Sequence, residues 1–452
     1  MKRKTLTDRS RTVPSDLIID NTNIDDLPEV LLVEILCRLP CNKLVFQCKC
    51  VSKRWFSLIS SSQSFVGRYL CIQHELQKPI NLTTLVVLHR GSNSLFTTSD
   101  HPVFKTKAAT SNFTLGFFPC YQAEAIPKMA EGTCYPWNVL KEGSIIPPVV
   151  VGTYKDLVLC CATKYNQRDY YLCNPYTKEW ARLPPTPQVY HTVAVALVCE
   201  PYYKCEQGSI ILNSEYRWKV VRAVPNSSDP NFHLEIFYSE THQWRELAVL
   251  CSQPFSSFFC VDSSSVMAYN GMLYWWRCDG FMLELDLSMF TTSTCSSGDH
   301  NIAKCRFIEL PEDLKVSGIP HLVVSQGRLL MYMYMLLAFD DEDLHSIKVW
   351  ELKQVVEDNS IQDKFKWLVD SLSLTSEVIP LMRPKNGRHR FNVIAFHQNS
   401  EDTVYIYCAH EIVTCNLHGG KLEAATKIRI LSLLDFCYPF VLPWWPTPIP
   451  KL

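Results

Sequence analysis

Four residues near the C-terminal end of the chain have side chains of the kind that hold zinc in proteins. They are Cys408, His410, Cys415 and His418. Cys408 and His410 would share one face of a strand, because side chains alternate along it. The spacing Cys-x-His-x4-Cys-x2-His does not match the patterns typical of zinc sites. We interpret the cluster as a hairpin with incidental thiols and predict no metal site.

The short motifs of common enzyme active sites are missing from the sequence. We find no Gly-x-Ser-x-Gly elbow, no P-loop, no His-Glu-x-x-His and no dinucleotide-binding fingerprint. A paired Cys-x-x-Cys is missing as well. We therefore predict no catalytic residues and no cofactor.

Composition narrows the class of partner. The 452 residues have a formal net charge of -1, so no global field attracts nucleic acid or an anionic membrane. The 20 cysteines follow an N-terminus without an apolar signal segment, which favours free thiols in a reducing compartment. We expect a cytoplasmic or nuclear protein. The basic cluster Lys2-Arg3-Lys4 leaves open a nuclear signal or an ordinary solvated tail.

The composition changes along the chain and predicts several zones. Residues 1–23 are polar and aperiodic, which is typical of a disordered leader. A helical module is predicted over residues 24–70, with a linker at 71–79. Short strands and turns follow over 80–445, and a Pro-rich tail is predicted at 446–452.

The helical module has more apolar surface than its own size can cover. Leu27, Leu31, Ile35 and Leu39 recur every four residues, with further leucines beside them. Pro28 suits the first turn of a helix and Pro40 ends it. A core of this size buries only about 60% of the unfolded surface. The apolar surface that this core cannot cover must face another domain or another protein.

Two segments of this module together resemble an F-box. The first is Ile24-Asp25-Asp26-Leu27-Pro28-Glu29-Val30-Leu31-Leu32-Val33-Glu34-Ile35-Leu36-Cys37-Arg38-Leu39-Pro40, and the second is Cys50-Val51-Ser52-Lys53-Arg54-Trp55-Phe56-Ser57-Leu58-Ile59. Cys41 stands where the family more often has Val. The resemblance implies docking on a Skp-type adaptor, which carries a cullin scaffold.

The same resemblance identifies the adaptor-binding residues. They are Leu27, Pro28, Ile35, Leu39, Pro40, Val51 and Trp55. Some of these side chains could instead fill the core of the module. For Leu31, Leu36 and Leu58 we favour a place in that core.

The strand-rich zone carries a degenerate repeat. Asn174-Pro175-Tyr176-Thr177-Lys178-Glu179-Trp180 is followed 64 residues later by Tyr238-Ser239-Glu240-Thr241-His242-Gln243-Trp244, where 244 − 180 = 64. Each unit predicts two strands reversed by a turn, with Trp at the start of the outer strand. One such sheet cannot bury both faces, and radial stacking solves this while protecting the sheet edges.

This zone resembles the F-box-associated, kelch-like repeat domain of plant F-box proteins. The fold class implied is mainly β: a small all-α module, then a propeller of about six blades, with seven also open. The ends should pair in one composite blade. Its candidate strands are 82–88 and 113–117 from one end and 427–431 and 436–442 from the other, with Trp444 and Trp445 nearby.

The resemblance implies the substrate-recognition subunit of an SCF-type ubiquitin ligase. The module would bind the adaptor, and the propeller would bind an unidentified target protein. One alternative is an F-box interaction protein that does not drive degradation. A less favoured alternative is a propeller enzyme, which would need converging carboxylates or a metal set in the central channel.

Overall fold

The computed structural model describes the helical module and most of the strand-rich zone. The described residues are 24–40, 42–61, 63–76, 82–90, 113–119, 149–161, 166–177, 179–190, 193–206, 209–224, 232–250, 266–276, 280–287, 302–312, 321–325, 327–339, 342–355, 364–373, 392–396, 403–408, 411–416, 421–427 and 437–450. The chain divides into two compact units, with the boundary between Gln73 and His74. That boundary lies inside the predicted linker, residues 71–79, but the first part of this stretch is not a linker, because the helix Gln63–Glu75 continues through it with Ile72 and Gln73 buried.

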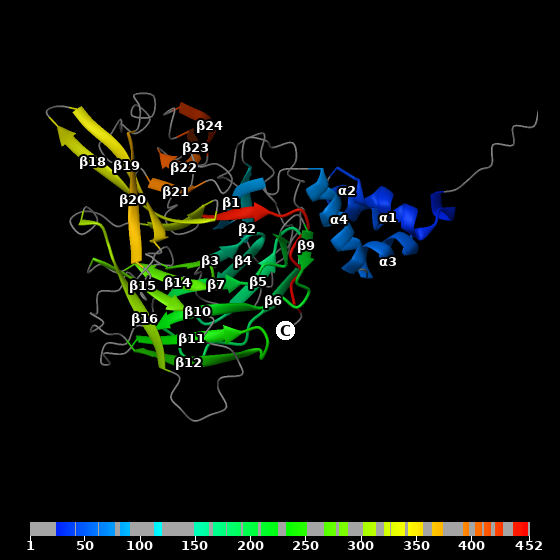
Figure 1. Ribbon diagram of the computed structural model, residues 1–452, viewed down its shortest axis with the longest axis horizontal. Coiled ribbons are helices and arrows are strands. Elements are labelled where there is room, and N and C mark those ends of the chain that lie inside the picture. Colours follow the sequence, from blue (N-terminus) through cyan, green and yellow to red (C-terminus); the bar gives the residue numbers. More distant parts are fainter. Residues whose placement is uncertain are drawn as a thin grey trace, which may run out of the picture. The chain divides into compact units, whose positions relative to one another are not determined.

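The first unit is helical (Figure 1). Its elements are η1 (Ile24–Asp26), α1 (Glu29–Cys37), α2 (Asn42–Cys48), α3 (Lys53–Ser61) and α4 (Gln63–Glu75). Pro28 precedes α1 with an extended backbone, φ −52° and ψ 142°, and Glu29 places a negative charge in the first turn. Ser52 caps α3, because its Oγ accepts a hydrogen bond from the Trp55 N–H at 3.2 Å.

The core of the first unit draws on every α-helix. Its buried apolar residues are Leu32, Leu36, Cys37, Val45, Trp55, Leu58, Ile59, Phe65, Val66, Tyr69, Leu70 and Ile72. Polar contacts also tie α4 to α1. Gln73 Nε2 donates to the Cys37 backbone oxygen at 3.0 Å, and both residues are buried. Burial raises the pKa of the Cys37 thiol to about 12, so this thiol stays protonated.

In the second unit, the described strands form a β-propeller. Five blades have four antiparallel strands each. They are β3 (Val149–Tyr154), β4 (Leu157–Cys161), β5 (Tyr170–Asn174) and β6 (Glu179–Arg182); β7 (Ala194–Cys199), β10 (Trp218–Val224), β11 (Phe232–Tyr238) and β12 (Gln243–Leu250); β13 (Val266–Tyr269), β14 (Met272–Trp276), β15 (Phe281–Asp286) and β16 (Ile302–Glu309); β17 (His321–Ser325), β18 (Arg328–Phe339), β19 (Glu342–Val355) and β20 (Lys364–Ser373); and β21 (Asn392–Phe396), β22 (Thr403–Cys408), β23 (Glu411–Asn416) and β24 (Lys421–Lys427).

The second and third blades differ from this plan in two details. A hairpin of β8 (Tyr203–Glu206) and β9 (Ser209–Leu212) is inserted between β7 and β10. A short parallel pairing of β12 with β16 joins the two blades into one sheet. Asn270 and Gly271 form the β13–β14 turn, and both have positive φ, 48° and 78°, which is the conformation that an Asn-Gly pair favours in tight hairpins.

The two ends of the strand-rich zone pair with each other, as expected from the sequence. β1 (Leu82–Arg90) lies between β2 (Phe113–Pro119) and the C-terminal strand β25 (Cys437–Leu442), drawn in red in Figure 1. The inner strands β3, β7, β13, β17, β21 and β25 contact one another in that order, and β25 contacts β3. The three-stranded sheet therefore closes the ring, which confirms the fold class and the composite blade. Of the expected strand at 427–431, only Lys427 lies within the described residues, at the end of β24.

Consecutive tryptophans show how neighbouring blades pack. Trp275 lies in a buried cluster with Ala194 of the second blade, whereas Trp276 lies in a cluster with Trp350 of the fourth. Alternate side chains of β14 thus pack to opposite sides of their own blade. The repeat tryptophans differ from one another, because Trp244 is half-buried against the first blade while the Trp180 side chain is 43% exposed.

The chain continues to make contacts beyond β25. The sequence predicts a tail from residue 446, but Thr447 is buried and its N–H donates to Asp156 Oδ2 at 2.7 Å. Tyr216 donates from its hydroxyl to the Pro448 backbone oxygen. The described part of the predicted tail, residues 446–450, therefore belongs to the packed propeller.

Candidate functional site

Helix α1 is apolar on nearly every side, yet it packs through only one. Its sequence is Glu-Val-Leu-Leu-Val-Glu-Ile-Leu-Cys, with Leu32, Leu36 and Cys37 in the core. Val30 is 73% exposed, and Leu31 and Ile35 are about half exposed at 51% and 45%. Helices that are apolar all round are normally covered on all sides. The outer face of α1 therefore has the composition of a buried surface without being buried in this unit.

Other elements of the first unit expose large apolar side chains too. The complete described set is Ile24, Val30, Leu31, Ile35, Leu44, Val51 and Phe56. Arg54 fixes part of this surface, since its Nη2 donates to the Leu27 backbone oxygen at 2.7 Å. This contact holds the segment before α1 against the start of α3, next to Val51. A small domain that exposes this many large apolar groups has the character of a protein-binding surface.

The structure divides the seven residues that the sequence indicated for adaptor binding. Pro28, Ile35, Pro40 and Val51 are exposed, and Leu27 and Leu39 are half-buried. Trp55 is only 6% exposed and belongs to the core. Six of the seven residues are therefore at least partly accessible, whereas Trp55 lies in the core.

The adaptor-binding set taken from the sequence omits five of the exposed large apolar residues of this unit, which are Ile24, Val30, Leu31, Leu44 and Phe56. Leu31 was expected in the core, but its side chain is 51% exposed, while Leu36 and Leu58 are buried as expected. A usable signal existed for Val30, because a nine-residue helix with only two charged residues cannot bury its whole circumference in so small a domain.

Charged residues border the apolar side chains of α1. Glu34 lies in an ion pair with Arg38 one turn later and accepts from Arg68 Nε at 2.5 Å. The hydrogen bond from Arg68, followed by that from Arg38, lowers the pKa of the Glu34 carboxyl to about 2. Glu34 thus stays ionised at physiological pH and links α1 to α4.

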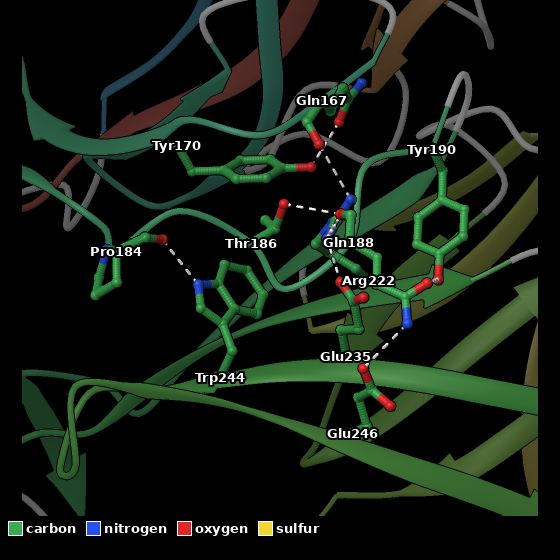
Figure 2. A network of polar contacts seen from close by, with 10 residues as sticks. All are labelled: Gln167, Tyr170, Pro184, Thr186, Gln188, Tyr190, Arg222, Glu235, Trp244 and Glu246. Atoms are coloured by element: carbon green, nitrogen blue, oxygen red, sulfur yellow. Dashed lines mark hydrogen bonds and ion pairs between the residues drawn. The ribbon is translucent and has the colours of Figure 1, made fainter.

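The propeller contains a network of polar contacts around Arg222, at the junction of its first two blades (Figure 2). Arg222 of β10 is fully buried and forms an ion pair with Glu235 of β11. Its Nη1 donates to the Gln188 backbone oxygen at 3.2 Å and its Nη2 to the Gln167 backbone oxygen at 3.1 Å. The guanidinium also lies 5.6–5.8 Å from the ring centroids of Tyr170, Tyr190 and Trp244.

These contacts hold the loop that connects the first two blades. In that loop, residues 183–190, the Pro184 backbone oxygen accepts from Trp244 Nε1 at 2.8 Å. Pro185, Pro187 and Val189 remain exposed at its outer side. An exposed loop on a rigid support is the kind of element that carries recognition in such folds.

A metal centre receives no support from the described residues. In the part of the chain that the structure describes, no group of three or more His, Cys, Asp or Glu side chains is placed to hold a metal ion. His410 and His418 of the sequence cluster lie outside the described residues. Among the described helices, none has the length and apolar character needed to cross a membrane.

Comparison with known proteins agrees with both units. The family model "F-box domain" matches residues 24–66, and the family model "F-box protein At3g26010-like, beta-propeller" matches residues 116–432. The second match covers more than half of the chain. The protein therefore belongs to this family of F-box proteins with a β-propeller.

Two relatives from Arabidopsis thaliana illustrate the likeness. The chain is 23% identical to the F-box protein At5g07610 over 404 residues, which is 86% of this chain and 82% of the relative. It is 25% identical to the F-box protein At5g49610 over 170 residues, covering 36% of this chain and 41% of that relative. An F-box followed by a propeller is the domain composition of a substrate adaptor.

Proposed function

We propose that this protein is the substrate-recognition subunit of an SCF-type ubiquitin ligase. The F-box unit docks on a Skp-type adaptor and through it on a cullin. The propeller binds a target protein, and the other subunits carry out ubiquitin transfer, so this chain is not an enzyme. Residence in the cytoplasm, the nucleus or both is part of the proposal.

One observation carries the docking step: exposed apolar side chains surround a complete core in the first unit. Leu32, Leu36 and Trp55 already fill that core, so Val30, Ile35 and Val51 are not needed to close it. Full burial of such a side chain against a partner contributes about 1.5–3 kcal/mol. A partner that covers several of these apolar side chains therefore gains enough binding free energy to form a stable complex.

The test is adaptor binding by purified protein. The double variant Val30→Ser/Val51→Ser should weaken binding to a Skp-type adaptor roughly 100-fold or more, which corresponds to about 3 kcal/mol. Gln63→Ala changes an exposed polar residue at the start of α4 and is the matched control. Circular dichroism should show the same helical signal for all three proteins. Unchanged affinity of the double variant would contradict docking through this surface.

Degradation needs a separate measurement. Once a target has been found, its turnover should be compared in cells with the intact chain and with a chain lacking residues 24–70. Faster turnover only with the intact chain supports the ligase proposal. Equal turnover with target binding preserved would support the alternative of a non-degradative F-box protein.

A further inference from the structure

The last eight described residues form a strap across the first blade. We define the C-terminal strap as residues 443–450, with the sequence Pro-Trp-Trp-Pro-Thr-Pro-Ile-Pro. Four of its eight residues are proline and lack an N–H group, so the strap cannot pair as a strand. It must be held by other means.

Side chains of the propeller accept hydrogen bonds from the strap. Backbone N–H groups of the strap donate to side chains of the second unit. Trp444 N–H donates to the Tyr203 hydroxyl at 3.0 Å, Thr447 N–H to Asp156 at 2.7 Å, and Ile449 N–H to Glu179 at 3.4 Å. Thr447 is the central anchor, because it is buried and bonded through both its backbone and its side chain.

Asp156 is the hub of that anchor. It lies in the turn between β3 and β4 and has no exposed surface. Its Oδ2 accepts from Thr447 N–H and from Asn174 Nδ2, and its Oδ1 accepts from Thr447 Oγ1, each at 2.7 Å. Asn174 Nδ2 also donates to the Thr447 backbone oxygen at 2.7 Å. One carboxyl group thus joins two turns of the first blade to the chain end, 291 residues away.

We infer that Asp156, Asn174 and Thr447 form a proton-sensitive lock, which holds the C-terminal strap more tightly when the Asp156 carboxyl is protonated. The two N–H groups that donate to Oδ2 cannot accept a hydrogen bond, so a proton on the Asp156 carboxyl must sit on Oδ1. The hydroxyl of Thr447 can reverse its role, because it donates to a carboxylate and accepts from a protonated carboxyl. The lock therefore keeps its hydrogen bonds in either charge state, and the cost of burying the negative charge disappears on protonation.

The burial of Asp156 supports tighter closure in the protonated state. Burial raises the pKa of Asp156 from 3.8 to about 6, against the lowering effect of the hydrogen bonds from Thr447 and Asn174. A raised pKa in the closed state means that the lock is strongest below about pH 4. It weakens as the pH rises through about 6 and Asp156 becomes charged.

Other ionisable side chains lie near the lock and the strap, and one of them is His74, whose ring centroid lies 6.2 Å from that of Trp444. Burial lowers the pKa of Lys155, and it raises the pKa of four neutral groups, which are Tyr154, Cys199, Tyr203 and Tyr216. Glu179 and Glu200 are exposed carboxylates at the same end of the blades. Asp156 is therefore the buried acid of this group.

Hydrogen exchange of the full-length protein tests the inference. Protection factors of the Trp444, Thr447 and Ile449 amides, corrected for the intrinsic effect of pH, report opening of the strap. From a closed-state pKa of about 6, we expect the opening equilibrium to rise roughly tenfold between pH 5 and pH 7.5. Asp156→Asn should remove this dependence. Glu179→Gln, which changes an exposed acceptor of the same strap, should keep it.

Thr447→Val is the second variant, used if Asp156→Asn does not fold. It removes one donor to the carboxylate, so the strap should open more, and its pH dependence should extend to higher pH. The inference is overturned if the parent strap opens equally at both pH values. It is also overturned if Asp156→Asn keeps the parent slope or if Thr447→Val matches the parent at every pH.

Discussion

Arg222 and Glu235 face each other across β10 and β11 and form an ion pair with almost no access to solvent. Desolvation by burial raises the pKa of Glu235, with the charge of Arg222 acting against this effect. The pair also reaches the first blade, through the backbone oxygens of Gln167 and Gln188 (Figure 2). It therefore couples two neighbouring blades by charge as well as by packing.

The first prediction removes one partner of this pair. Arg222→Met should destabilise the propeller by about 3–5 kcal/mol, because the carboxyl of Glu235 is left buried without its counter-charge. The double variant Arg222→Met/Glu235→Leu should recover much of that loss. Urea unfolding of the full chain, followed by tryptophan fluorescence, measures both. A single variant that is as stable as the parent would show that the pair does not couple the blades.

The second prediction concerns the core of the F-box unit. Trp55→Ala should cost about 3–5 kcal/mol, because the side chain is only 6% exposed and its loss leaves a cavity. A unit this small has little stability to spare, so it should unfold and lose the adaptor. Circular dichroism and adaptor binding are the readouts. A folded variant that has lost only binding would instead place Trp55 in the contact surface.

The third prediction uses the ion pairs of Glu34. Its folded pKa of about 2 lies below the usual 4.5, so the stabilisation is present above about pH 4.5 and is lost as the pH falls toward 2. Glu34→Gln should reduce this acid sensitivity of the helical unit. Helical signal against pH, in the parent and the variant, is the measurement. Gln47→Ala, at an exposed uncharged residue of α2, is the control and should keep the acid sensitivity of the parent.

Much of the fold was predictable, for physical reasons. The four-residue recurrence of Leu27, Leu31 and Ile35 and the placement of Pro28 locate α1, because helix geometry and capping are local. The pairing of β1 with β25 was also expected, since a ring needs its ends joined. The length of the repeat, by contrast, varies with inserted hairpins such as β8–β9 and leaves the blade count approximate.

The individual site residues were less predictable. Leu31 and Leu36 look alike in the sequence, but only the packing of the other helices decides that Leu31 is exposed and Leu36 is buried. The lock of Asp156 and Thr447 joins residues 291 positions apart, and no local pattern marks such a contact. Arg222 and Glu235 likewise carry no motif, because their pairing depends on the register of β10 and β11.

The last prediction separates strand pairing from the strap at the point where the ring closes. Removing residues 443–452 should lower the melting temperature of the propeller but leave it monomeric, because β25 still fills the gap between β21 and β3. Removing residues 437–452 also deletes β25 and leaves β1 with an open edge, which invites pairing with another chain. This longer truncation should melt at a still lower temperature and form larger species in size-exclusion chromatography. If both truncated proteins stay monomeric and melt like the parent, the C-terminal segment does not close the ring.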